Sequence, residues 1–215
     1  NLSEEEALEI FDDIGIQIVN YKISFNEKQA IEHSSQIGFP LAMKVLSNQI
    51  LHKTETGGVE LNIKNLEELK TSFQKLSDVF QKLKMKSSDE KFLIQKMEKG
   101  IAEIILGYRV DELVGPIVVL GSGGILSEIY NDKSIRMAPV DITEAKKMIN
   151  EVKSLVTITG YRGLPEADIN IIANAVMNMS KFAFVKEIKE AEINPVIVKK
   201  ENEGIVAVDG LITLN

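Results

Sequence analysis

The sequence predicts an α/β (α+β) protein folded as two lobes. Stretches with helical spacing of apolar residues alternate with short runs rich in Ile, Val and Leu, so we expect both helices and strands. A polar, charged segment over residues 84–91 precedes a second half that is richer in strand patterns, and the two lobes are expected to meet near residues 84–97. The chain has 215 residues, which is enough for one large domain or for two small ones with a core each.

Capping residues and glycines define the elements of the first part. Ser3 followed by Glu6 is a capping-box pattern, which predicts a helix over residues 3–14 that stops at Gly15. The other expected elements of this part are a strand over 16–23, a helix over 26–37, strands over 41–46 and 59–63, and a helix from 65 to about 83.

Strand patterns are more frequent in the second part. The expected elements are strands over 92–97, 102–109 and 117–120, helices from 141 to about 153 and from 168 to about 185, and a closing strand pair over 187–198 and 204–214. We therefore expect a smaller lobe over residues 16–92 and a larger lobe over 93–215. The N-terminal helix, residues 1–15, is expected to pack on the larger lobe.

Composition excludes several classes of function. The formal net charge is −7, which argues against a general nucleic-acid-binding role. No apolar run approaches the roughly 20 residues that span a bilayer, and the acidic start does not resemble a secretory signal. The chain has no cysteine, so disulfides, zinc–thiolate sites and thiol catalysis are excluded. We expect a cytoplasmic protein that binds neither nucleic acid nor membrane.

A lysine and a pair of glycines suggest a phosphate site. Lys44 lies inside an otherwise apolar strand, where its charge is costly to bury without a partner, although a lysine at a strand edge could also reach solvent. The polar segment that follows ends in Gly57-Gly58. Glycines let the backbone approach a phosphate closely, but paired glycines also mark ordinary turns.

The two histidines differ in their surroundings. His33 falls in a predicted exposed helix and is interpreted as a surface residue. His52 lies in the polar loop beside Lys53 and two threonines. His52 is either a solvated loop histidine, or a nucleophile that carries a phosphoryl group, or a general base.

The C-terminal strand pair carries oxygen ligands. Asn194 follows Glu192 in one strand, and Asp209 lies on the next strand, where a hairpin can bring it beside Asn194. Carboxylate and amide oxygens suit Mg²⁺, which also retains waters and phosphate oxygens. The alternative is a polar sheet face with a turn-forming Asn-Pro. Pro195 lacks an N–H and indicates an edge or a bend rather than a central strand position.

Segments along almost the entire chain, in preserved order and spacing, resemble the beta subunit, or fused ATP-grasp domain, of ADP-forming acetyl-CoA synthetases. A more distant resemblance is to the succinyl-CoA synthetase beta subunit, above all at the Glu-Ile-Asn-Pro and Asp-Gly end. The segments that carry the resemblance are Met43 to Ser47, Ile50-Leu51-His52-Lys53-Thr54, Gly57-Gly58-Val59, Gln95-Lys96-Met97, Gly121 to Gly124 with Glu128, Ile135-Arg136-Met137-Ala138-Pro139, Gly160-Tyr161-Arg162-Gly163, Glu192-Ile193-Asn194-Pro195 and Val208-Asp209-Gly210.

The resemblance implies an ATP-grasp fold with the nucleotide between two lobes, and the reaction acyl-CoA + ADP + phosphate ⇌ acid + CoA + ATP with Mg²⁺. It implies that His52 relays a phosphoryl group to ADP. The other implied roles are phosphate binding by Lys44 and by a loop of Gly57, Gly58 and Val59, adenine contacts from the backbone of Gln95, Lys96 and Met97, ribose binding by Glu103, and Mg²⁺ binding by Asn194 and Asp209 with Glu192 nearby.

The resemblance also implies a partner. The 215 residues hold no CoA-binding Rossmann-like domain and no first phosphohistidine loop, so we expect a CoA-binding alpha subunit or domain and a hetero-oligomer. Two alternatives remain open. One is a non-catalytic ATP-grasp sensor module of a fused protein acyltransferase, and the other is an ATP-grasp carboxylate–amine ligase; neither needs His52.

Overall fold

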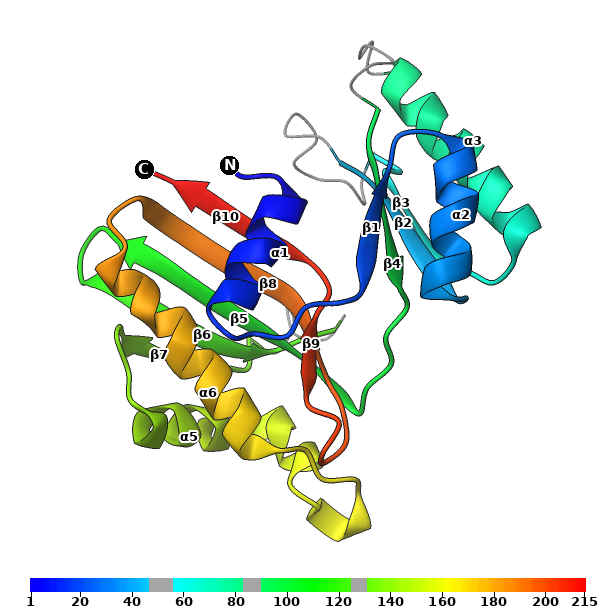
Figure 1. Cartoon of the computed structure of the whole chain (residues 1–215). Coiled ribbons are helices and arrows are strands. Elements are labelled where there is room, and N and C mark those ends of the chain that lie inside the picture. The colour runs from blue at the N-terminus through cyan, green and yellow to red at the C-terminus, as the bar shows by residue number, and fades with distance from the viewer. Residues whose placement is uncertain (47–55, 83–89, 125–130) are drawn as a thin grey trace. The chain divides into compact units, whose positions relative to one another are not determined.

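The computed structural model describes residues 1–46, 56–82, 90–124 and 131–215. These residues form two compact units, which we call the small unit (Val19–Met97) and the large unit (Asn1–Ile18 with Glu98–Asn215) (Figure 1). The boundary falls after residue 97 rather than at 92, the limit expected from the sequence. The reason is that strand β4 (Phe92–Lys96) pairs with two strands of the small unit.

The small unit is a four-stranded antiparallel sheet with two helices on one face. Its strand order is β1-β4-β2-β3, so β4 and β2 are the inner strands. Its elements, in chain order, are β1 (Tyr21–Ser24), α2 (Glu27–Ile37), β2 (Leu41–Val45), β3 (Val59–Ile63), α3 (Leu66–Lys82) and β4. The Asn26 side chain caps α2 by accepting a hydrogen bond from Gln29 N.

The core of the small unit lies between the sheet and its helices. Alternate residues of the inner strands, such as Met43 and Phe92, belong to this core, as the period of two in a strand requires. Phe80 of α3 meets the ring of Phe92 edge-on, with 5.4 Å between ring centroids. The intervening residues of β2 and β4 therefore lie on the opposite face of the sheet.

The large unit contains a six-stranded sheet in which all neighbouring strands are antiparallel. The order is β10-β8-β5-β6-β7, and β9 also pairs with β8. Its helices and strands are α1 (Glu4–Asp13), β5 (Ala102–Asp111), β6 (Gly115–Ser122), β7 (Lys133–Met137), α5 (Ile142–Glu151), α6 (Ile169–Ser180), β8 (Ile188–Val198), β9 (Ile205–Ala207) and β10 (Gly210–Leu214). Three short 3₁₀ turns, Lys153–Ile158, Tyr161–Gly163 and Lys181–Phe184, complete the described part of this unit.

One face of the large sheet is covered by helices (Figure 1). Helix α6 packs on β5 and β6, and α1 packs on β10. Phe11 of α1 lies 6.3 Å from Phe182, measured between ring centroids, and a Cβ on Gly210 would come within 2.7 Å of the Phe11 ring. Gly210 thus allows α1 to approach β10 closely. The alternate residues of β5, which include Glu103 and Gly107, lie on the other face of the sheet.

Several elements differ from those expected, and the strand expected over 204–214 is divided into β9 and β10. The expected strand over 16–23 is wrong before Tyr21: Ile18 forms a single parallel bridge to Ala207, because the chain passes here from the large unit to the small one. The helix expected to reach residue 185 ends at Ser180 and continues as a 3₁₀ turn. Strand β7 was not expected, since its sequence is short and largely polar.

Among the described residues, no helix combines the length and the apolar content that a membrane span requires.

Candidate functional site

Lys44 and Gln95 lie on the same face of the small sheet, opposite its helices. Lys44 pairs with Leu93 of β4 and with Val59 of β3, while Gln95 pairs with Ala42. Both polar residues are only 4% exposed. Because β2 is an inner strand, Lys44 is not the solvent-reaching lysine of a strand edge. A buried ammonium group requires polar or anionic neighbours, so Lys44 makes this face of the sheet a positively charged site.

The Gly57-Gly58 turn leads into strand β3, which begins beside Lys44. Gly57 has φ +71°, a left-handed conformation that favours glycine, and the space where its Cβ would lie is open. Gly58 O accepts a hydrogen bond from Val45 N at 2.9 Å. The next residue, Val59, is the cross-strand partner of Lys44. The turn and the lysine are therefore held together by the β2–β3 ladder.

The segment expected to contact adenine already uses two of its backbone donors. Lys96 N donates to Asn20 O, and Met97 N donates to Pro40 O, both at 3.0 Å. The Lys96 side chain donates to the carbonyls of Gly38 and Phe39 at 3.0 and 2.9 Å, where it closes the end of α2. Contacts from this segment to a base would have to come from its other backbone atoms.

A pocket of about 380 Å³ opens in the large unit beside the start of β5. This volume lies within the range of roughly 300–1,000 Å³ that is usual for small-molecule sites. The exposed residue Glu103, expected to bind ribose, is one of its walls, and Ile197 of β8 lies opposite Glu103 in the β5–β8 ladder. The remaining lining residues are Glu98, Lys99, Gly100, Ile101 and Ala102.

Two glycines permit the close backbone packing that shapes this pocket. A Cβ on Gly100 would lie 2.2 Å from Val198 O and 2.6 Å from a methyl group of Ile197. A Cβ on Gly123 would lie 2.8 Å from the Cβ of Glu103, whose carbonyl accepts a 2.7 Å hydrogen bond from Gly123 N. Side chains at either position would push the pocket walls apart.

The structure brings Asn194 and Asp209 together. Asn194 N donates to Asp209 O at 3.3 Å, and the Asn194 amide donates to Glu192 Oε1 at 3.3 Å. Strand β8 gains one residue relative to β5 here, since Ile104 pairs with Val196 and Leu106 with Ile193. Pro195 thus lies in an inner strand, which the sequence argued against, but at a bulge, where the missing N–H is tolerated.

The oxygen atoms at this bulge fit a magnesium ion that is shared with a phosphate ligand. Within the ranges that the structure describes, no group of three His, Cys, Asp or Glu could hold a metal by itself. Glu192, Asn194 and Asp209 offer two carboxylates and one amide. Mg²⁺ commonly uses one or two carboxylates and completes its shell with waters and substrate phosphate oxygens, so the set is adequate for a nucleotide-bound ion.

The two histidines have different outcomes. His52 lies outside the described residues, so its expected role stays a prediction. His33 was interpreted as a surface residue, and this was wrong in part: the side chain is half-buried, with 2.8 Å between Nδ1 and the hydroxyl of the buried Ser24. The bond ties α2 to β1.

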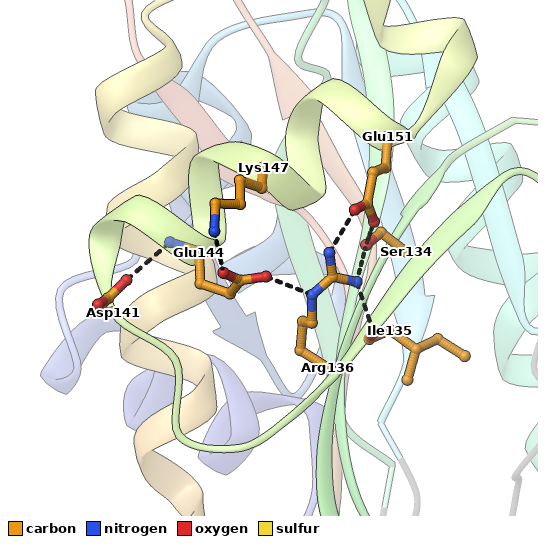
Figure 2. A network of polar contacts seen from close by, with 7 residues as sticks. All are labelled: Ser134, Ile135, Arg136, Asp141, Glu144, Lys147 and Glu151. Atoms are coloured by element: carbon orange, nitrogen blue, oxygen red, sulfur yellow. Dashed lines mark hydrogen bonds and ion pairs between the residues drawn. The ribbon is translucent and has the colours of Figure 1, made fainter.

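Arg136, from one of the segments that carry the resemblance, links β7 to α5 (Figure 2). Its Nε donates to Glu144 at 2.6 Å and its Nη2 donates to Glu151, whose other oxygen accepts from Ser134 at 2.6 Å. The Arg136 guanidinium lowers the pKa of both glutamates, and the glutamates, Glu151 first, raise the pKa of Arg136. This network holds an edge strand in place.

Sequence reasoning did not identify the pocket residue Ile197, nor Lys199, which contacts the pocket residue Glu98. Lys199 forms a 2.8 Å ion pair with Glu98, a pocket residue far away in the sequence. The only local signal was the pair Lys199-Lys200, which is also typical of a solvated turn. Only the β5–β8 pairing reveals the contact.

The fold and the sites define a class of protein: two α/β units with antiparallel sheets, a buried lysine beside a glycine turn in one, and in the other a pocket of about 380 Å³ and a separate set of oxygen ligands at the β8 bulge. Comparison with known proteins specifies the class further. A model of the ATP-grasp domain matches residues 1–214. The chain belongs to the ATP-grasp family.

Three relatives of this chain are named as CoA ligases. It is 36% identical to the beta subunit of acetate–CoA ligase [ADP-forming] I from Pyrococcus furiosus, over 99% of the chain and 91% of the relative. It is 34% identical to the 4-hydroxybutyrate–CoA ligase [ADP-forming] of Nitrosopumilus maritimus, but spans only 31% of that protein. The succinate–CoA ligase beta subunit of Alkaliphilus metalliredigens is more distant, at 26% identity over 97% of the chain and 53% of the relative.

Solved structures of an acetyl-coenzyme A synthetase from Ca. Korarchaeum cryptofilum share the fold. The complex with coenzyme A and Ca-AMPCP has a TM-score of 0.90 at 33% identity and covers 100% of this chain and 93% of that one. A complex with coenzyme A and Mg-AMPPCP, described with its phosphohistidine segment pointing towards the nucleotide binding site, has a TM-score of 0.82 at 32% identity. It covers 99% of this chain and 92% of that one.

Proposed function

We propose that this chain is the nucleotide-binding part of an ADP-forming acyl-CoA synthetase, which catalyses acyl-CoA + ADP + phosphate ⇌ acid + CoA + ATP. The observation that carries the proposal is the buried Lys44 on an inner strand, held by the β2–β3 ladder beside the Gly57-Gly58 turn. The relatives named as ADP-forming CoA ligases support the reaction, and the structures with nucleotide analogues support the ligand.

Different residues bind different parts of the magnesium nucleotide. Lys44 neutralises charge on the phosphates, and the backbone of Gly57 and Gly58 can approach them closely. The pocket beside β5 takes the nucleoside, with the Glu103 carboxylate accepting hydrogen bonds from ribose hydroxyls. Asn194 and Asp209, with Glu192 nearby, would hold Mg²⁺, which supplies positive charge to the phosphate oxygens.

His52 is the proposed phosphoryl relay. Its neutral imidazole attacks the phosphorus of a phosphohistidine presented by the partner, so that one N–P bond forms as another breaks. An oxygen of the ADP β-phosphate then attacks the same phosphorus, which yields ATP and returns His52 to its neutral form. Positioning and charge stabilisation by Lys44 and Mg²⁺ suit such a transfer, since phosphoryl transfer requires little covalent help from the protein.

The proposal includes a partner. The relay requires a CoA-binding alpha subunit or domain with its own phosphohistidine, and thus a hetero-oligomer where the two parts are separate chains. A cytoplasmic enzyme fits the acyl-CoA and nucleotide substrates.

The test is phosphoryl transfer in a reconstituted mixture. The chain is combined with a matching alpha subunit, Mg²⁺ and γ-labelled ATP, and acid-labile, base-stable phosphate is measured on wild type, His52→Ala and His33→Gln. We expect label on wild type and on His33→Gln, and loss of both label and acyl-CoA synthesis in His52→Ala. Unchanged turnover in His52→Ala would contradict the relay, and no Mg-ATP-dependent labelling or turnover in any pairing would favour a sensor module.

A further inference from the structure

An ion pair links one wall residue of the pocket in the large unit, Glu98, to the end of strand β8. Lys199 Nζ lies 2.8 Å from Glu98 Oε2, and each side chain is only 20% exposed. Glu98 lines the pocket, and Lys199 directly follows strand β8. By contrast, the lysine of the ion pair between Lys147 and Glu144 is 62% exposed. Partial burial makes the Glu98–Lys199 pair less subject to screening than ordinary surface pairs.

The backbone around this pair is held tightly against β8. Ile101 N donates to Val198 O at 2.8 Å, and Gly100 packs on the same carbonyl. On the other side, Lys199 N donates to Gly204 O at 3.0 Å, which anchors the lysine at the base of the β8–β9 hairpin. The backbone of Lys199 is therefore fixed, and the segment that follows Glu98 is held on the same strand.

We propose that Lys199 is a positioning residue for the nucleotide: it holds and neutralises the Glu98 carboxylate, so that the pocket accepts the nucleoside of a nucleoside diphosphate. This inference rests on the proposed function of the pocket. Two carboxylates, Glu98 and Glu103, line a small space. Glu103 is suited to accept ribose hydroxyls, whereas an unpaired Glu98 would only add negative charge.

The charge of the ligand makes this neutralisation important. The diphosphate of a nucleotide lies one ribose away from its base, well inside the Debye length of about 10 Å at 0.1 M salt. Without Lys199, the Glu98 carboxylate would repel this diphosphate and would be free to turn into the pocket. Adenosine has no phosphate and would be affected much less.

The experiment measures the dissociation constants of Mg-ADP and adenosine on the full chain by calorimetry. Lys199→Met is expected to weaken Mg-ADP binding about five-fold at low salt, the upper range for a partly exposed ion pair. The loss should shrink as salt rises, and adenosine binding should change less than two-fold. Lys199→Arg should bind like wild type, and the double variant Glu98→Gln/Lys199→Met should recover most of the ADP affinity.

The matched control is Lys200→Met, which makes the same change of net charge at the neighbouring exposed residue. It should bind both ligands within two-fold of wild type. Mg-ADP affinity in Lys199→Met equal to that in Lys200→Met would overturn the inference, and so would a double variant that binds as weakly as Lys199→Met. A wild type that binds neither ligand would overturn the proposed function and this inference with it. Thermal unfolding of each variant separates loss of affinity from loss of fold.

Discussion

At the scale of single residues, the backbone packs very closely at Gly100. The backbone carbonyl of Val198 would meet a Cβ there at 2.2 Å, a distance that no side chain can occupy without moving β8 or the pocket segment. Gly107, farther along the same stretch of chain, offers a contrast. A Cβ there would meet its nearest neighbour at 3.8 Å, which is ordinary contact.

Gly100→Ala is therefore expected to destabilise the chain by about 1–3 kcal/mol, the usual cost of overpacking, and to weaken nucleotide binding at the adjacent pocket. Gly107→Ala should change stability by much less. Urea unfolding followed by circular dichroism checks the first expectation, and ADP titration checks the second. Equal stability of the two variants would show that the pocket segment is not held against β8 as described.

Some single residues could be assigned from the sequence and others could not. Lys44 could be identified, because one charge in an apolar strand is visible without a structure. The pairing of Asn194 with Asp209 followed from hairpin geometry, and the register confirms it. Lys96 could not be assigned, because its side chain binds the carbonyls of Gly38 and Phe39, which are distant in sequence. Lys199 could not be assigned either, because its partner Glu98 is distant in sequence.

At the scale of elements, most helices could be predicted because their caps are local. Ser3, Asn26 and Asp141 each cap the helix that the sequence predicts after them. Strand β7 could not be predicted, because it is stabilised by tertiary contacts rather than by an apolar run. Ser134 and Arg136 hold it on α5 through Glu144 and Glu151.

This network gives a prediction with a defined pH dependence. Hydrogen bonds from Arg136 lower the pKa of Glu144 and Glu151 below the ordinary value of 4.5. A carboxyl with a lowered pKa in the folded state contributes stability that is fully present above its unfolded pKa and is lost as the pH falls through the folded one. Arg136→Met should therefore be less stable than wild type at pH 7, and the difference should shrink below pH 4.5.

Chemical unfolding of both proteins at pH 7 and at several values below pH 4.5 measures this difference. Lys147→Met is the matched control, because it removes a more exposed cation from the same cluster, one that bonds Glu144 alone. Lys147→Met should lower the stability at pH 7 less than Arg136→Met does. A destabilisation by Arg136→Met that is independent of pH would mean that the arginine acts by packing and not through its carboxylate partners.

At the scale of the whole molecule, the two-part organisation could be predicted from the change in composition near residue 90. The antiparallel pairing of both sheets could not, because strand order is not visible in apolar runs. The resemblance supplied the fold, and the match of the ATP-grasp model to residues 1–214 confirms it. The roles of Lys44, Glu103 and the residues at the β8 bulge stay predictions until a ligand is measured.

The central claim is that this chain binds a magnesium nucleotide through Lys44. The most direct measurement is titration of ADP into the chain, with and without Mg²⁺, for wild type, Lys44→Met and the exposed control Lys64→Met. The account predicts that wild type binds ADP and that Mg²⁺ strengthens this binding. ADP binding should be at least about ten-fold weaker in Lys44→Met than in wild type, because a charge-assisted contact to phosphate is lost. It should be unchanged in Lys64→Met. Equal ADP binding by wild type and Lys44→Met, or none by wild type with Mg²⁺ present, would contradict it.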